Sequence, residues 1–224
     1  MRHYQKLGLL VLSCAVFIMA SVSVFASSNV VVYEDFSGYN TEGELERMWF
    51  PFQNKGPLQL IEDSSCTGGK GVGVRLGEKA KMGCGWYPFE PMTKGSVEIR
   101  FYDPNNPYEQ GSSGVAGITD ELAKFWLFVG VGTSNFGQPR FPNNYAFRLH
   151  GGNPGWTLTN VKRTEGWHVL KFAFDHYKIT AFIDDVVVFE TEAAPFNKVG
   201  GVAIGSLWPV YDDQLIFDTV TVME

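Results

Sequence analysis

Two segments of the chain, 96–102 and 145–150, alternate apolar residues with ionisable or hydroxyl-bearing residues. Alternate side chains of an extended strand point to the same face, so each segment presents its polar set on one side. A third segment, 125–131, places a tryptophan out of register with its other large apolar residues. If the three segments lie in one sheet, they bring six side chains together: Glu98, Arg100, Tyr102, Trp126, Arg148 and His150.

Such a surface would suit a sugar. The ring of Trp126 would stack on the C–H face of a pyranose, while the arginines and Glu98 would bind hydroxyls or a uronate carboxylate. A simpler alternative is that the arginines pair with Glu98 on a solvated sheet face, which contributes little to stability. Other large aromatics fall in or beside turns, where exposing a ring without a ligand is costly. The favoured binding residues among them are Trp208 and Tyr211.

The sequence lacks the residue patterns that several other kinds of chemistry require. The sequence has no Ser-His-Asp or Cys-His pattern, no glycine-rich phosphate loop after a strand and no zinc-ligand spacing. Its 24 acidic and 18 basic residues give a formal net charge of −6. An acidic protein repels phosphate backbones and anionic membranes, so we expect no nucleic-acid partner.

The chain after residue 28 is a series of short apolar or alternating runs separated by Gly, Pro, Asn and Asp. These are strand and turn signals, and their spacing predicts an all-β fold of two antiparallel sheets packed face to face. Helix is expected over about two turns after Thr41, where Glu44 completes a capping box, and as a single turn at 119–124. Strands are expected over 30–36, 57–61, 71–76, 82–89, 96–102, 125–131, 145–150, 156–160, 167–174, 178–183, 186–191, 202–206 and 215–222.

The first 26 residues have the layout of a signal peptide. Arg2 and Lys6 precede an apolar run, and Ala26 closes a small-x-small cleavage pattern. We predict a secreted protein, extracellular or periplasmic, whose mature part (27–224) is one β-sandwich domain that is not embedded in a membrane. Two alternatives are an uncleaved membrane anchor and a lipoprotein signal ending at Cys14.

Cleavage would leave two cysteines, Cys66 and Cys84. In an exported protein an isolated pair is most simply a disulfide. A loop of this length would stabilise the fold by about 3 kcal/mol. The alternative is two unpaired thiols.

The last third of the chain carries a recognisable order of motifs. Trp167-His168 opens a strand, Asp184-Asp185 separates two more, and residues 216–222 read Ile-Phe-Asp-Thr-Val-Thr-Val. With Tyr-Glu-Asp-Phe at 33–36, this order resembles the concanavalin A-like lectin/glucanase superfamily in its laminin G-like form. The resemblance implies a jelly-roll sandwich with one convex and one concave sheet, and glycans bound on the concave face or in its rim loops. One departure is Asp185, where the family has glycine, so a longer or bulged hairpin loop is expected.

The resemblance also bears on catalysis and metals. The Glu-x-Asp-x-x-Glu strand of laminarinase-type glucanases is absent, which argues against that retaining chemistry. Jelly rolls of the alginate-lyase type use an arginine to neutralise a uronate and a His or Tyr to remove its C5 proton. Arg100, Tyr102 and His150 loosely resemble that set, although the Tyr-Phe-Lys-x-Gly strand is missing. The only cofactor implied is a calcium ion, held by Glu34 or Asp35 together with Asp218. Alternative rim sites are Asp103 with Asn105 and Asp212 with Asp213.

We therefore expect a secreted, non-catalytic carbohydrate-binding module whose partner is a polysaccharide or another glycan. Two alternatives stay open. One is a polysaccharide lyase acting on uronate-containing glycans, and the other is a structural or adhesive surface protein.

Overall fold

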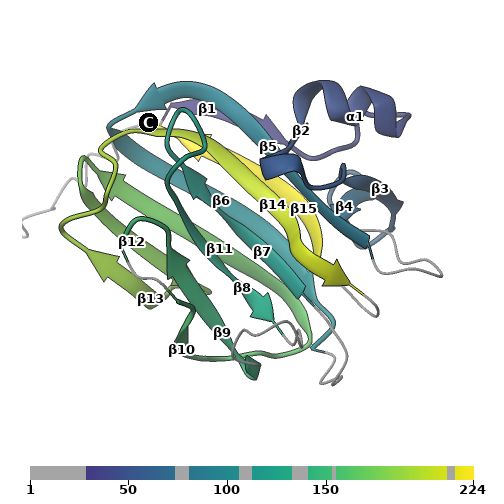
Figure 1. The fold of residues 1–224 in the computed structure, drawn as a ribbon. Helices are drawn as coiled ribbons and strands as arrows, with labels where there is room; N and C mark the ends of the chain where they lie inside the picture. Colours follow the sequence, from purple (N-terminus) through teal and green to yellow (C-terminus); the bar gives the residue numbers. More distant parts are fainter. Residues whose placement is uncertain (1–28, 74–80, 106–112, 133–140, 153–154, 211–214) are drawn as a thin grey trace, which may run out of the picture.

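The computed structural model describes residues 29–73, 81–105, 113–132, 141–152, 155–210 and 215–224. Two antiparallel β-sheets pack face to face, and one short helix, α1 (Glu42–Met48), lies at one end of them (Figure 1). This arrangement is the two-sheet jelly-roll sandwich that the sequence predicts.

The first sheet consists of eight strands: β1 (Val30–Glu34), β3 (Gln59–Glu62), β4 (Lys70–Gly73), β6 (Lys94–Asp103), β11 (Gly166–Asp175), β12 (Lys178–Ile183), β13 (Val186–Thr191) and β15 (Ile216–Met223). Their spatial order is β13-β12-β11-β6-β15-β4-β3, and β1 also pairs with β15. The first and last strands of the chain are therefore neighbours in one sheet.

The second sheet consists of seven strands: β2 (Phe50–Pro51), β5 (Lys81–Met92), β7 (Ser113–Thr119), β8 (Trp126–Gly132), β9 (Phe141–Leu149), β10 (Thr157–Lys162) and β14 (Val199–Val210). Their spatial order is β10-β9-β8-β7-β14-β5-β2. A short 3-10 turn, η1 (Phe52–Asn54), follows β2.

Alternation along each strand divides its side chains between the sandwich interior and an outer face. In β6, Val97, Ile99 and Phe101 are buried in the core, and Leu127 and Val129 of β8 enter the same core from the second sheet. Burying each large apolar side chain stabilises the fold by roughly 1.5–3 kcal/mol. The intervening residues of each strand point outward, and these are the side chains available to a surface site.

The region of β7 differs from the sequence prediction. This strand reads Ser-Gly-Val-Ala-Gly-Ile-Thr and lies between β8 and β14, yet its small residues gave no strand signal. They are required by close packing, because a Cβ on Gly117 would lie 2.1 Å from the carbonyl oxygen of Leu127. The predicted helical turn at 119–124 is wrong. Residues 120–124 form a non-helical turn in which the Asp120 carboxylate accepts hydrogen bonds from the backbone N–H groups of Lys124 and Phe125.

The predicted N-cap of α1 at Thr41 is confirmed, and the Glu44 carboxylate reaches back one residue further than in a standard capping box. Thr41 Oγ1 accepts a hydrogen bond from the Glu44 N–H (3.2 Å), and the Glu44 carboxylate accepts one from the Asn40 N–H (2.7 Å). α1 has seven residues. No helix within the described ranges combines the length and apolarity needed to cross a membrane.

The β12–β13 hairpin closes through two residues, because Ile183 pairs with Val186. Asp184 and Asp185 both have positive φ (48° and 64°), as a type I′ turn requires. The expected longer or bulged loop is therefore wrong, and the irregularity in this hairpin lies within its strands. The Asp184 carboxylate helps to hold the turn, since it accepts a hydrogen bond from the Val169 N–H (2.8 Å).

A buried ion pair lies at the end of β6. The side chains of Asp103 and Arg163 have no exposed surface. Arg163 donates two hydrogen bonds to the Asp103 carboxylate, from Nε (2.9 Å) and from Nη2 (2.7 Å). The Asn105 N–H donates a third (2.7 Å). This pair neutralises two charges inside the fold.

Candidate functional site

The six residues predicted to share one surface divide between the two sheets. Glu98, Arg100 and Tyr102 lie on β6 of the eight-stranded sheet. Trp126 begins β8, Arg148 lies in β9 and His150 directly follows it, all in the seven-stranded sheet. Each group is on the outer face of its own sheet, because the residues that alternate with it enter the core between them.

The predicted common surface is therefore wrong, and so is the lyase arrangement that required Arg100, Tyr102 and His150 together. The physical reason is that alternation fixes the face of a strand and leaves open the sheet to which that strand belongs. β6 pairs with β11 and β15, whereas β9 pairs with β8 and β10.

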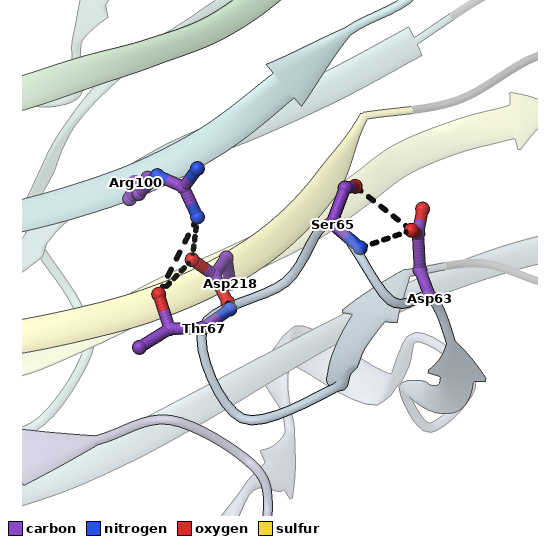
Figure 2. Close-up of polar contacts among 5 residues, drawn as sticks. All are labelled: Asp63, Ser65, Thr67, Arg100 and Asp218. Atoms are coloured by element: carbon purple, nitrogen blue, oxygen red, sulfur yellow. Dashed lines mark hydrogen bonds and ion pairs between the residues drawn. The ribbon is translucent and has the colours of Figure 1, made fainter.

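On the eight-stranded sheet Arg100 is held by the protein itself. Its guanidinium donates to the Asp218 carboxylate and lies 3.9 Å from the centre of the Trp167 ring (Figure 2 shows the Asp218 side). Thr67 also binds Asp218, through its backbone N–H (2.6 Å) and its hydroxyl (2.7 Å). Asp218 is fully buried and sits at a register shift in β15, which turns its side chain toward Arg100.

The other polar groups on this sheet also have partners. Lys171 donates to Glu98 (2.7 Å), and the Tyr102 hydroxyl donates to Glu165 (3.1 Å). Desolvation, with the neighbouring Glu165 carboxylate, raises the pKa of Tyr102. Arg100 and Lys171 are thus each paired with a carboxylate of the fold, which is typical of a structural surface.

On the seven-stranded sheet the arrangement is different. The Trp126 ring stacks on Phe128 (centroids 4.6 Å apart, planes 21° apart) and on the His150 imidazole (4.9 Å, 12°). The Arg148 guanidinium lies over the same indole, 5.4 Å from its centre. Trp126 is only 4 % exposed, whereas His150 is exposed to solvent. The result is an aromatic stack with His150 as its exposed member and the Arg148 guanidinium beside it.

Two polar atoms of this group have no hydrogen-bond partner among the residues that the structure describes. They are Trp126 Nε1 and Arg148 Nε, and both are buried. A buried donor left unpaired costs roughly 1–3 kcal/mol, so folded proteins rarely retain one without a reason. The His150 ring also makes no side-chain hydrogen bond within the described part of the chain, and its contacts are with aromatic rings.

The rest of this outer face is an apolar bed. The cross-strand register places Gly117 beside Phe128, and Ala203 between Gly117 and Trp86. These small residues leave room for Phe52 of η1, which is 1 % exposed and packs edge-on against Phe128 at 5.5 Å. The Trp86 indole N–H donates to Thr119 Oγ1 (3.0 Å).

Sequence reasoning identified Trp126, Arg148 and His150 and missed the residues that support them. Phe128 was recoverable, because it lies two positions from Trp126 and so shares its face of the strand. Phe52 was not, since it reaches the sheet from a turn. Trp208 and Tyr211 stay predictions, because the Trp208 side chain and all of residue 211 lie outside the described part of the structure.

The three proposed calcium ligands are each engaged elsewhere. Glu34 accepts hydrogen bonds from the Phe36 N–H and the Tyr39 hydroxyl, while Asp35 accepts from the N–H and hydroxyl of Ser37. Asp218 is bound by Arg100 and Thr67, as described above. Among the described residues no group of three or more Asp, Glu, His or Cys side chains is placed to hold a metal ion. The predicted calcium site is therefore corrected: its carboxylates serve turns and an ion pair.

The predicted disulfide is also corrected. Cys66 and Cys84 are both free and buried. Cys66 precedes β4 and lies near Asp218 of the eight-stranded sheet, whereas Cys84 lies in β5 and packs into the apolar bed of the other sheet. Sequence separation could not show that the two cysteines belong to opposite layers. Burial raises the pKa of the Cys66 thiol to about 12, and burial also raises the pKa of Cys84.

Solved structures with a similar fold are known, although sequence comparison finds no relative. No protein-family model and no curated protein sequence matches the chain. The kappa-carrageenase of Pseudoalteromonas carrageenovora, solved with an oligotetrasaccharide of kappa-carrageenan, aligns over 92% of this chain and 98% of its own, with 10% identity and a TM-score of 0.51. The potassium-bound carbohydrate recognition domain of Emp46p aligns over 86% and 95%, with 10% identity and a TM-score of 0.52.

The chain thus has the jelly-roll fold of the concanavalin A-like lectins and glucanases. At such low identity this similarity establishes the fold alone. A fold of this kind hosts many functions, so the function has to be argued from the side chains of the site.

Proposed function

We propose that this protein binds carbohydrate on the outer face of its seven-stranded sheet, at Trp126, Arg148 and His150. The observation that carries the proposal is the pair of unpartnered buried donors, Trp126 Nε1 and Arg148 Nε, in an aromatic stack whose outer member, His150, is exposed. Aromatic surface suits the C–H faces of a sugar ring, and the free donors suit its oxygens.

The opposite sheet supports this choice by contrast. Its aromatic residue, Trp167, is covered by Arg100, and that arginine is neutralised by Asp218. A ligand there would have to displace an existing ion pair. A ligand beside the exposed His150 would displace no described ion pair, and a small side-chain shift would let it accept from Trp126 Nε1 and Arg148 Nε, which have no partner among the described residues. The kappa-carrageenase that shares the fold was solved with an oligotetrasaccharide, and the Emp46p domain is a carbohydrate recognition domain, so sugars are the first ligand class to test.

The test is a binding titration of the protein against a panel of neutral and acidic polysaccharides, followed by calorimetry or intrinsic tryptophan fluorescence. We expect His150→Ala to weaken binding at least about tenfold, since a lost polar contact of about 1.4 kcal/mol has that effect. His176→Ala is the matched control, because His176 is also exposed and its imidazole pairs with Asp175 at the β11–β12 hairpin of the other sheet. Equal binding by the two variants would contradict the proposed site.

We also infer that the protein is exported and loses residues 1–26. The charged start, the apolar run and the Ala26 cleavage pattern support this inference. Expression in a secreting host, with N-terminal sequencing of the exported protein, is the test. A mature chain beginning at Ser27 is expected, and an intact N-terminus retained in the membrane fraction would contradict export.

A further inference from the structure

We propose that the ligand of this face is an anionic sugar, and that its carboxylate or sulfate group binds the Arg148 guanidinium. This inference rests on the proposed function and goes one step further, because it names the chemical class of the glycan. It depends on a difference between arginines: Arg100 and Arg163 are paired with carboxylates, whereas Arg148 has no acidic partner among the described residues.

Arg148 is the arginine on the sheets that has no acidic partner within the described residues. Arg100 is paired with Asp218, and Arg163 is paired with Asp103 through two hydrogen bonds. No described carboxylate forms an ion pair or hydrogen bond with Arg148, and its Nε is buried without a partner. In a chain with a net charge of −6, such an arginine is an unbalanced positive charge at a partly buried position.

The surroundings of Arg148 fix how it can bind. Its guanidinium lies over the Trp126 ring, and a cation held over an indole keeps the N–H groups at its edge free for an acceptor. The guanidinium fork matches the paired oxygens of a carboxylate or a sulfate ester, which it binds more strongly than a neutral hydroxyl. His150, stacked on the same indole, adds ring nitrogens on the solvent side.

The net negative charge of the protein restricts the inference further. A long-range field that repels polyanions is screened beyond about 8 Å at physiological ionic strength, while a contact with a partly buried arginine is screened much less. Binding therefore has to come from direct contact with Arg148, because the overall charge of the protein does not attract anions. For this reason we expect no general affinity for polyanions. The anion must be presented on a sugar ring that stacks beside Trp126.

The experiment uses polymers that differ only in charge. Dextran is compared with dextran sulfate, and polygalacturonate with its methyl ester, while poly-L-glutamate serves as an anionic polymer without sugar. We expect the charged member of one or both pairs to bind at least about tenfold tighter than its neutral counterpart. Preference for dextran sulfate identifies a sulfate as the ligand group, and preference for polygalacturonate identifies a carboxylate.

Variants assign the effect to Arg148. Arg148→Gln is expected to abolish the preference for charge, and Arg148→Lys to retain part of it, because a point charge replaces the planar fork. Arg47→Gln is the matched control: it changes the net charge equally at an exposed position on α1. Unchanged urea unfolding would show that each variant is folded. If Arg148→Gln does not fold, Arg148→Lys and the polymer pairs still decide the question.

The outcomes separate this inference from the proposed function. Equal binding of charged and neutral polymers, weakened by His150→Ala, would overturn the anionic ligand and leave carbohydrate binding in place. Binding of poly-L-glutamate as tight as that of the charged glycans would also overturn it, because charge alone would then be recognised. Binding to none of the polysaccharides, charged or neutral, would count against both proposals.

Discussion

Replacing Arg163 with methionine should destabilise the protein strongly. The substitution keeps much of the side-chain length and removes both hydrogen bonds that Arg163 donates to Asp103. It leaves the Asp103 carboxylate fully buried, with the Asn105 N–H as its remaining described donor. The Tyr145 ring lies nearby, and burial, with the charge of Asp103, raises the pKa of its hydroxyl.

The magnitude follows from the cost of an uncompensated buried charge. Breaking a buried ion pair by removing one partner costs about 3–5 kcal/mol. The total stability of a domain is about 5–15 kcal/mol, so Arg163→Met should remove a large fraction of it. The double variant Asp103→Leu/Arg163→Met leaves no buried charge and should recover most of the loss, since apolar replacements of buried pairs are often neutral.

The assay is urea unfolding followed by tryptophan fluorescence, with the free energies of unfolding compared at constant slope. The control is Lys94→Met, which breaks the exposed pair of Lys94 with Asp175 (3.4 Å, side chains 74% and 49% exposed). That change should cost less than about 1 kcal/mol. If Arg163→Met cost no more than Lys94→Met, the reasoning about buried charge in this fold would be refuted.

Four further predictions concern the turn, the central strand and the cysteines. Asp185→Gly should raise the free energy of unfolding by about 0.5–1 kcal/mol, because Asp185 holds φ at 64° without a side-chain hydrogen bond in the described structure; a lower urea midpoint would contradict this. Gly117→Ala should lower the free energy of unfolding by at least about 1–3 kcal/mol, because the new Cβ would lie 2.1 Å from the Leu127 carbonyl oxygen. Gly155→Ala is the control, because a Cβ there meets no atom within 4 Å and only the loss of a glycine is tested. In the absence of reductant, Cys66 and Cys84 should react with a thiol reagent only once the protein is unfolded. If they did not react in the unfolded protein either, a disulfide would be indicated. Because the Cys66 pKa rises from 9.0 in an open chain to about 12 when folded, the unfolded chain loses this proton first, so stability should fall as pH rises between these values. Cys66→Ala should make that decline shallower, as measured by urea unfolding at pH 8 and pH 10.

The limits of sequence reasoning are clearest on β6 and β9. Alternation correctly assigned Val97, Ile99 and Phe101 to the core and Arg100 to the outer face. It could not assign the strand to a sheet, because pairing partners are separated by long stretches of sequence. β6 pairs with β11 and β15, which begin more than sixty residues later in the chain.

Local irregularities account for other differences. The extra residue in β15 turns Asp218 toward Arg100, so a carboxylate expected at a calcium site forms an ion pair instead. β7 escaped detection because Gly114, Ala116 and Gly117 interrupt its β-branched residues, and close backbone packing selects glycine at position 117. Trp126, Arg148 and His150 were correctly placed together, since their strands are direct neighbours.

The central claim, that sugar binds at Trp126, can be tested by NMR of the indole N–H groups. The protein has six tryptophans, and Trp→Phe variants would assign each signal in a nitrogen-15 labelled sample. On titration with a glycan that the protein binds, the Trp126 signal should shift, since its Nε1–H, which has no partner among the described residues, gains an acceptor, while the Trp167 signal of the opposite sheet should stay in place. A shift of Trp167 with Trp126 unchanged at saturation would contradict sugar binding at Trp126.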